Sequence, residues 1–274
     1  MRRVIYSLYI DIQNAVSHFE NKNKFNDSYQ WLLDRHRQYA ALCGVEYKHY
    51  GYDKQYLEFA EQFGPEISEY NIINFYKIHL MYQLANDFDE ILYIDMDVVP
   101  VTSDNFFEEH DLSKGVAIMT GTADTQQRIN TLNTLRYTHD VRSPMAKWWN
   151  TKCLLSEGGY SSEPEVFNTG IVGATATHLK QLNYFDNFFE LLDQMKTMID
   201  DDFYPDSIRY MFGYDNETVW GYKTLSQNIP YQQLSKQWHF FMDKWSYIPK
   251  DSKLIHCVSK DFKYVREWCE KNSV

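Results

Sequence analysis

Residues 91–100, ILYIDMDVVP, constrain the fold of this 274-residue chain more than any other segment. The run of branched and aromatic residues predicts a buried strand of a mostly parallel sheet. Asp95 and Asp97 close this run and stand one residue apart. Ligands bind beyond the carboxyl ends of the strands in such sheets, so we expect both carboxylates at a binding site. There they can hold a hard divalent cation, which can in turn hold phosphate oxygens.

The alternative for Asp95 and Asp97 is an ordinary polar turn after a strand. We disfavour it because Asp is depleted in strands and because burying two unpaired carboxylates is costly. The two residues are therefore predicted to form a site.

Apolar periodicity elsewhere predicts an α/β fold, in which strands and helices alternate around a Rossmann-like, mostly parallel central sheet. Further strands are expected at 4–10, 45–50, 115–120, 167–174, 240–245 and 253–258, and helices at 28–42, 67–84, 179–198, after Asp215 and at 262–271. Residues 122–165 are polar and turn-rich, which predicts an irregular insertion that forms an acceptor-facing lid. The C-terminal half is expected to be less regular than the N-terminal half.

Charge and cysteine content narrow the class of protein. The net charge of −11 argues against a large nucleic-acid footprint, because phosphate contacts need Lys and Arg. The four cysteines have no zinc-site spacing and are predicted to be free thiols in a reducing compartment. The apolar stretch after Arg2 and Arg3 is short and contains Asp11, so we predict a first strand and not a signal peptide. Without an apolar run of membrane-spanning length, a soluble, cytoplasmic protein is expected.

Residues 76–100, YKIHLMYQLANDFDEILYIDMDVVP, give the chain a family resemblance. A helix with a basic residue, an apolar strand and an Asp-x-Asp motif follow one another. In this the chain resembles the GT-A glycosyltransferases and, within them, the glycogenin-like retaining family. The resemblance implies that Asp95 and Asp97 hold Mn²⁺ or Mg²⁺ against the diphosphate of a nucleotide sugar. It also implies that Lys77 lies near the donor's sugar and phosphate, although a solvated surface lysine is the alternative.

Two further segments match the family in the expected order. FNTG, residues 167–170, is similar to its Phe-Asn-x-Gly strand, which implies that Asn168 faces the donor sugar. GYDNETVWGY, residues 213–222, stands where the family has an Asp-Gln pair at a helix start. Asp215 and Asn216 align with that pair and Glu217 follows, so these three are the candidate catalytic residues. Asn in place of Gln leaves the exact group open, and a plain helix N-terminus also explains Asp215 and Glu217.

The last match is KLIHCVSKDFKYVREW, residues 253–268, which resembles a His-containing strand end and basic loop. It implies that His256 is the third metal ligand, and an imidazole beside carboxylates suits manganese. The family's Gly and Lys-Pro-Trp after this His are not reproduced. Lys260 and Lys263 stand there and either neutralise the leaving diphosphate or form a solvated patch. Tyr9, at the end of the first predicted strand, is also expected to contact the donor.

The resemblance implies one domain over residues 1–274. About 1–120 would bind the nucleotide sugar and about 121–274 the acceptor. The implied reaction is transfer of a sugar, with retention, from a UDP-linked donor to a glycan or lipid-linked sugar. A modified nucleic-acid base as acceptor is disfavoured by the net charge. Retention can proceed by front-face attack or by double displacement through Asp215 or Glu217, and the sequence does not choose between them.

Two other classes of protein remain open. DMDVVPV also resembles the start of a haloacid-dehalogenase-type phosphohydrolase, whose first Asp is a nucleophile. That motif lies on the first strand, whereas here two predicted strands precede it. A non-catalytic glycan-binding protein is the second alternative, and it would leave the Asp pair without a metal.

Overall fold

The computed structural model describes residues 1–11, 19–121, 142–200, 202–242 and 247–272. Six strands form the central sheet in the order β2-β1-β3-β6-β5-β7. They are β1 (Arg3–Leu8), β2 (Glu46–Tyr50), β3 (Glu90–Ile94), β5 (Val116–Thr120), β6 (Phe167–Thr175) and β7 (Tyr231–Gln233). β6 pairs antiparallel with β3 and with β5, while the other neighbours pair in parallel. The predicted α/β fold with a mostly parallel sheet is confirmed.

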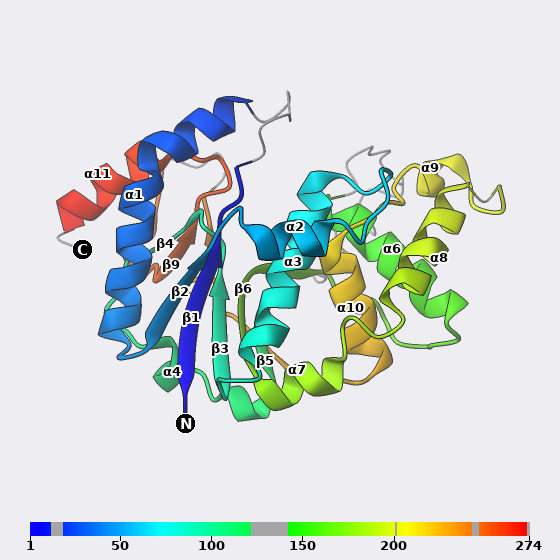
Figure 1. Cartoon of the computed structure of the whole chain (residues 1–274), viewed down its shortest axis with the longest axis horizontal. Helices are drawn as coiled ribbons and strands as arrows, with labels where there is room; N and C mark the ends of the chain where they lie inside the picture. The colour runs from blue at the N-terminus through cyan, green and yellow to red at the C-terminus, as the bar shows by residue number, and fades with distance from the viewer. Residues whose placement is uncertain (12–18, 122–141, 201, 243–246, 273–274) are drawn as a thin grey trace.

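Helices cover both faces of this sheet (Figure 1). One side carries α3 (Glu69–Leu84), α7 (Ala176–Leu182) and α10 (Asn216–Ser226), with α2 (Lys54–Ala60), α6 (Pro144–Glu157), α8 (Phe188–Asp200) and α9 (Asp206–Arg209) around them. The other side carries α1 (Phe19–Leu42), against which α11 (Phe262–Asn272) packs, and the short α4 (Phe106–Glu109). Alternation along the strands supplies both cores. Tyr6 and Tyr93 face the α3 side, and Ile5 and Leu92 face the α1 side.

A second, small sheet has the strand order β4-β9-β8. Its strands are β4 (Val98–Pro100), β9 (Leu254–His256) and β8 (Phe240–Phe241). The predicted 91–100 segment therefore divides. β3 ends at Ile94 in the large sheet, and β4 begins at Val98 in the small one. Asp95 and Asp97 lie in the connection between the two sheets.

Two expectations about the C-terminal half need correction. Residues 144–157 form helix α6 and not an irregular insertion, because Ser143 caps the helix, Pro144 starts it, and Trp148 and Leu155 are buried at helical spacing. The predicted lid falls largely on residues 122–141, outside the described residues. The predicted 179–198 helix is two helices, because Asn183 ends α7 in a left-handed conformation.

Shorter differences concern strand and helix ends. The expected 240–245 strand is only Phe240–Phe241, and residues 243–246 lie outside the described part of the chain. α1 begins well before the predicted residue 28, and α2 was not predicted.

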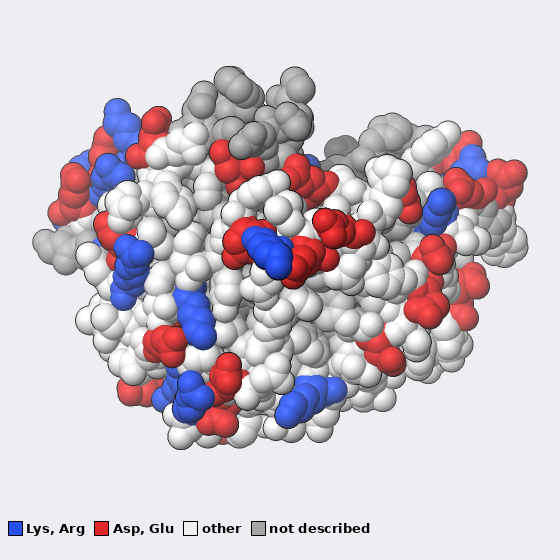
Figure 2. Space-filling view, in the orientation of Figure 1, with Lys and Arg blue, Asp and Glu red and all other residues white. Residues whose placement is uncertain are grey.

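The state of the cysteines and the distribution of charge on the surface can be compared with the composition. All four cysteines are free and buried. On the face that Figure 2 shows, Lys and Arg side chains of the described residues are scattered among Asp and Glu. Across the described segments, no helix combines the length and the apolar character that crossing a bilayer requires.

His36 links α1 to the small sheet. Its ring is fully buried, and Nε2–H donates to the Val98 carbonyl at 2.6 Å. Next to it, the Arg35 guanidinium donates to the Pro100 carbonyl at 2.6 Å. Burial lowers the pKa of His36 to about 4, although the hydrogen bond to Val98 opposes the shift. α1 therefore holds β4 through a histidine that must stay neutral.

This buried histidine predicts acid sensitivity. Unfolded His36 has its usual pKa near 6.5, so between pH 6.5 and 4 the unfolded state binds more protons than the folded one. His36's contribution is fully present above pH 6.5 and is lost as the pH falls towards 4. We expect the loss to reach about 3 kcal/mol of unfolding free energy at the acidic limit. Urea unfolding at pH 7 and at pH 4.5 measures it.

His36→Gln is the control, because an amide can donate to Val98 without titrating. Its unfolding free energy should fall less than that of the unaltered protein between the two pH values. Equal losses in both proteins would contradict the assignment to His36.

Candidate metal centre and adjoining cavity

Three predicted ligands lie together where the two sheets meet. Single ligand atoms of Asp95, Asp97 and His256 all lie within 4.8 Å of one another. His256 Nε2 is 3.5 Å from Asp97 Oδ2 and 3.9 Å from Asp95 Oδ2. These separations need only small adjustments for one ion at bond lengths of about 2.1 Å. Two carboxylates and one imidazole suit Mn²⁺ or a similar divalent cation. The residues therefore fit the metal that the sequence resemblance implies.

Backbone hydrogen bonds place these three residues. Asp95 N donates to Gly170 O at 2.8 Å, which ties the end of β3 to the start of β6. Cys257 N donates to Asp97 O at 2.8 Å, and β9 pairs antiparallel with β4 so that His256 stands opposite Val98. The site thus joins segments that are about 160 residues apart in the sequence.

Asp95 is oriented by the large sheet and α3. The hydroxyl of Tyr93 donates to Asp95 Oδ1, and Lys77 Nζ lies 3.4 Å from the same oxygen. Tyr6 holds the helix in turn, because its hydroxyl donates to the Lys77 carbonyl at 2.6 Å. Burial, with the Asp95 charge, raises the pKa of Tyr93 well above its usual value, so this hydroxyl remains a donor. Oδ2 of Asp95 is left to face His256.

Asp97 is more deeply buried than Asp95 and depends on a cation. Lys260 Nζ forms an ion pair with Asp97 Oδ2. Burial alone would raise the pKa of Asp97, but Lys260 and His256 beside it lower that pKa below its usual value. Asp97 is consequently an anion at neutral pH, which is the form that binds a metal.

His256 is enclosed by three neighbours. Its Nδ1 lies 3.0 Å from Nε2 of the buried His239, and the Phe241 ring stacks on it at 5.2 Å. Burial lowers the pKa of His239 well below its usual value, which keeps that ring neutral. On the remaining side lies Gly170, where a Cβ would come within 2.5 Å of His256 Cε1. Gly170 therefore leaves the space that the imidazole occupies.

This close approach predicts the effect of a single methyl group. Gly170→Ala should displace the His256 ring and weaken Mn²⁺ binding by about tenfold, the size of effect typical of groups that orient a ligand. Electron paramagnetic resonance of free Mn²⁺ in a titration measures the affinity. Gly121→Ala is the matched control, because no described atom lies within 4 Å of its Cβ position. An unchanged Mn²⁺ affinity in Gly170→Ala would show that the space beside Gly170 does not determine the position of His256.

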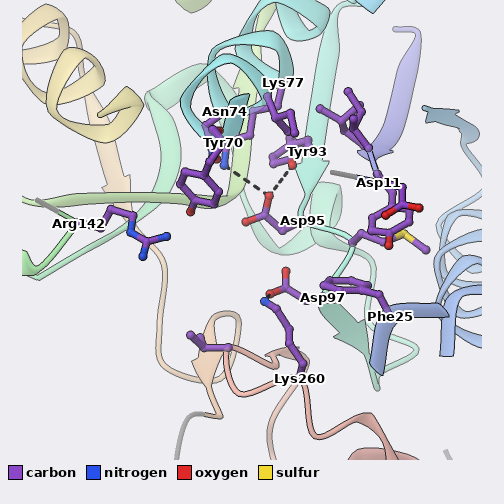
Figure 3. Close-up of a pocket in the computed structure, with 16 residues that line it drawn as sticks. Asp11, Phe25, Tyr70, Asn74, Lys77, Tyr93, Asp95, Asp97, Arg142 and Lys260 are labelled. Atoms are coloured by element: carbon purple, nitrogen blue, oxygen red, sulfur yellow. Dashed lines mark hydrogen bonds and ion pairs between the residues drawn. The ribbon is translucent and has the colours of Figure 1, made fainter. Parts of the chain in front are cut away.

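A cavity of about 540 Å³ opens beside the cluster, a size that suits a small ligand (Figure 3). Asp95 and Asp97 lie at its middle, between Lys77 and Lys260. One end carries Asp11, Tyr9 and Phe25, and the rings of Tyr9 and Phe25 stack at 5.1 Å. The opposite end is lined by Tyr70, Asn74 and Arg142, and the Arg142 guanidinium lies 4.8 Å from the centre of the Tyr70 ring. The cavity therefore has an aromatic end and a polar, cationic end on either side of the candidate metal ligands.

Some lining residues were not predicted, although the sequence held a signal for them. Tyr70, Asn74 and Lys77 are spaced i, i+4 and i+7 on α3, so a helix that brings Lys77 to the cavity brings the other two. Tyr93 stands two residues before Asp95, on the same face of the strand. Arg142 and Phe25 had no such signal, because only tertiary packing brings them to the wall.

Other predicted residues are not part of the described cavity wall. Asn168 Oδ1 accepts from Gly170 N at 3.0 Å, and Lys263 is exposed on α11. Asp215, Asn216 and Glu217 start α10 and are buried. The catalytic roles of these three residues stay predictions. Their hydrogen bonds are explained by a structural role at the start of α10.

Glu217 is the centre of this buried polar cluster. Its carboxylate accepts from Thr169 N at 2.7 Å and pairs with Lys147 Nζ of α6. Burial would raise its pKa, but Lys147 lowers it below the usual value, so Glu217 is charged. Asp215 accepts from Thr218 N at 2.8 Å, which caps α10, and burial together with the Glu217 charge raises its pKa. The cluster ties α10 and α6 to β6.

The ion pair predicts a specific pattern of stability. Lys147→Met should lower the unfolding free energy by about 3–5 kcal/mol, because it leaves a buried carboxylate without its partner. The double variant Lys147→Met/Glu217→Gln should lose less unfolding free energy than the two single variants lose together, and the difference should be about 1–3 kcal/mol. Chemical denaturation of the four proteins measures this coupling.

Lys152→Met, on the same helix, is the control, because its pair with Glu163 is largely exposed and should contribute at most about 1 kcal/mol. Equal effects of Lys147→Met and Lys152→Met would contradict a structural role for the buried pair.

No protein-family model matches the sequence, and a search of curated proteins gives no match. Solved structures similar to this chain include the galactosyltransferase LgtC in complex with donor and acceptor sugar analogues, with a TM-score of 0.44 and 13% identity over 87% of this chain and 75% of that one. Mouse xyloside xylosyltransferase 1 has a TM-score of 0.48 and 9% identity, and the match covers 94% of this chain and 98% of that one. A glycosyltransferase involved in glycosylation of the major capsid of PBCV-1 has a TM-score of 0.46 and 13% identity, and the match covers 97% of this chain and 98% of that one. At such low similarity, we base the functional proposal on the site itself.

Proposed function

We propose that this protein is a metal-dependent glycosyltransferase of the GT-A type, which moves a sugar from a nucleotide-sugar donor to an acceptor hydroxyl. The observation that carries the proposal is the convergence of Asp95, Asp97 and His256, whose two aspartates line the middle of a two-ended cavity. A cation there would lie between a surface for stacking and a surface for hydrogen bonding. That is the arrangement a nucleotide diphosphate sugar requires.

The aromatic end suits the nucleobase. Tyr9 and Phe25 offer ring faces on which a base can stack, and Asp11 offers a carboxylate to a base N–H. The sequence resemblance points to UDP as the nucleotide. Most of the wall comes from residues before 121, in agreement with a donor-binding N-terminal half.

The charges at the middle suit the diphosphate. When bound, Mn²⁺ or Mg²⁺ supplies a Lewis acid that withdraws charge from the diphosphate oxygens. Lys77 and Lys260 stand on either side of the aspartates and offset the negative charge that develops on the leaving group. Because both ammonium groups are already ordered by the aspartates, little reorganisation is needed as that charge develops.

The polar end then takes the transferred sugar and the acceptor. Tyr70, Asn74 and Arg142 offer a ring face, an amide and a guanidinium for hydroxyl groups. We propose front-face retention, because Asp215 and Glu217, the carboxylates considered for double displacement, are engaged in the buried cluster. A glycan or lipid-linked sugar is the proposed acceptor, and the net charge disfavours a nucleic-acid base.

A thermal-shift panel of nucleotides and nucleotide sugars, each with and without Mn²⁺, tests this proposal. A donor at about 100 times its Kd adds about 2.7 kcal/mol. For a chain of this size we expect the unfolding midpoint to rise by about 5–10 °C. The rise should require Mn²⁺ and one class of nucleotide, and it should disappear in Asp97→Asn, which also should lose transfer activity.

Asp193→Asn, an exposed change on α8, is the control and should keep the full shift. A shift that persists in Asp97→Asn or in excess chelator would refute the metal-dependent donor site. Turnover of a simple phosphate ester without any nucleotide-sugar shift would instead support the phosphohydrolase alternative.

A further inference from the structure

The two ring nitrogens of His256 face different surroundings. Nε2 points to the carboxylates of Asp95 and Asp97, at 3.9 and 3.5 Å. Nδ1 points away from them and lies 3.0 Å from Nε2 of His239. A metal ligand uses one imidazole nitrogen, and the hydrogen bond on the other decides which nitrogen is free. His239 therefore occupies the position from which the binding nitrogen of His256 is selected.

His239 is itself held firmly. It is 1% exposed, its backbone N donates to Ser235 O at 3.0 Å, and its ring stacks on Phe241 at 4.4 Å. The His239 and His256 rings are tilted by only 20°. The ring centroids lie 5.2 Å apart and the two nitrogens 3.0 Å apart, so the nitrogens lie between the rings, which is the geometry of a hydrogen bond along the ring planes. A side chain in this position resists rotation of His256.

The far nitrogen of His239 has no fixed role. His239 Nδ1 is buried and has no hydrogen-bond partner among the described residues. Nothing on that side decides which nitrogen of His239 carries the hydrogen. The pair can therefore adopt either direction of the shared hydrogen bond.

Metal binding requires one of these directions. If Nε2 of His256 gives its lone pair to a cation, its hydrogen must be on Nδ1, which then donates to His239 Nε2. His239 keeps its own hydrogen on Nδ1. In most proteins a carboxylate or a backbone carbonyl accepts this bond from the ligand, whereas here a neutral imidazole does.

We propose that His239 is the positioning residue of the candidate metal centre, which accepts the Nδ1 hydrogen of His256 and so presents Nε2 to the cation. This inference rests on the proposed function, because it takes Asp95, Asp97 and His256 as the metal ligands. It assigns a role to a residue that directly precedes β8 and that contacts neither the donor nor the metal.

Mn²⁺ titrations followed by electron paramagnetic resonance test the role. His239→Leu removes the acceptor and should weaken Mn²⁺ binding by at least about tenfold. His239→Gln places an amide oxygen at the same point and should stay within about threefold of the unaltered protein. His178→Leu is the matched control, because His178 is also buried with an unpartnered Nδ1 among the described residues, on α7. It should leave Mn²⁺ affinity unchanged, and circular dichroism checks that each variant is folded.

A spectroscopic measurement on the unaltered protein does not depend on any variant folding. In ¹⁵N-histidine spectra with Mg²⁺, which is diamagnetic, Nδ1 of His256 should carry the hydrogen and Nε2 should not. A bare Nδ1 in the Mg²⁺ complex would overturn the proposal, as would His239→Leu binding Mn²⁺ as tightly as the unaltered protein. The Asp97→Asn variant distinguishes a failure of the His239 inference from a failure of the proposed function. If the unaltered protein binds no Mn²⁺, or Asp97→Asn binds it equally well, the proposed function fails as well.

Discussion

The antiparallel pairing of β4 with β9 is the interaction on which the candidate site depends. It sets His256 opposite Val98, and the Cys257–Asp97 backbone bond extends it to the aspartate itself. Without this pairing, the Asp-x-Asp segment would be an acidic turn at the end of a strand. α1 supports the same sheet through His36 and Arg35, and its Phe25 also lines the adjoining cavity.

Charge balance is the second constraint. Asp11, Asp95 and Asp97 line the cavity together with Lys77, Arg142 and Lys260, so three carboxylates face three cations. Such a wall is tolerable to bury because each deeply buried charge has a partner, as Asp97 has in Lys260. A divalent cation added to this wall leaves an excess of two positive charges, which a diphosphate with two negative charges would neutralise. The charges of the wall therefore agree with the proposed metal–diphosphate ligand.

Much of the fold could be predicted from the sequence where the pattern was long and local. The 91–95 strand, the 67–84 helix and the strand at 167–174 were expected, because buried strands and long helices have distinct apolar periods. The 122–165 expectation failed over α6, whose Ser-Pro start and buried Trp148 were hidden in a polar stretch. The split at Asn183 was missed because the apolar pattern continues through a left-handed residue that only backbone geometry reveals.

For the site, the sequence by itself determined the chemistry of the groups: two carboxylates after a buried strand, a basic helix before it, and a histidine at a late strand end. The family resemblance predicted that His256 meets the two aspartates, but only the tertiary structure decided how these groups meet and which others join them. It brought His256 and Lys260 to Asp97, held Glu217 on Lys147 and Thr169 away from the cavity wall, and placed His239 behind His256. The physical reason is that strand order and register join residues far apart in the chain, and no local period encodes those pairings.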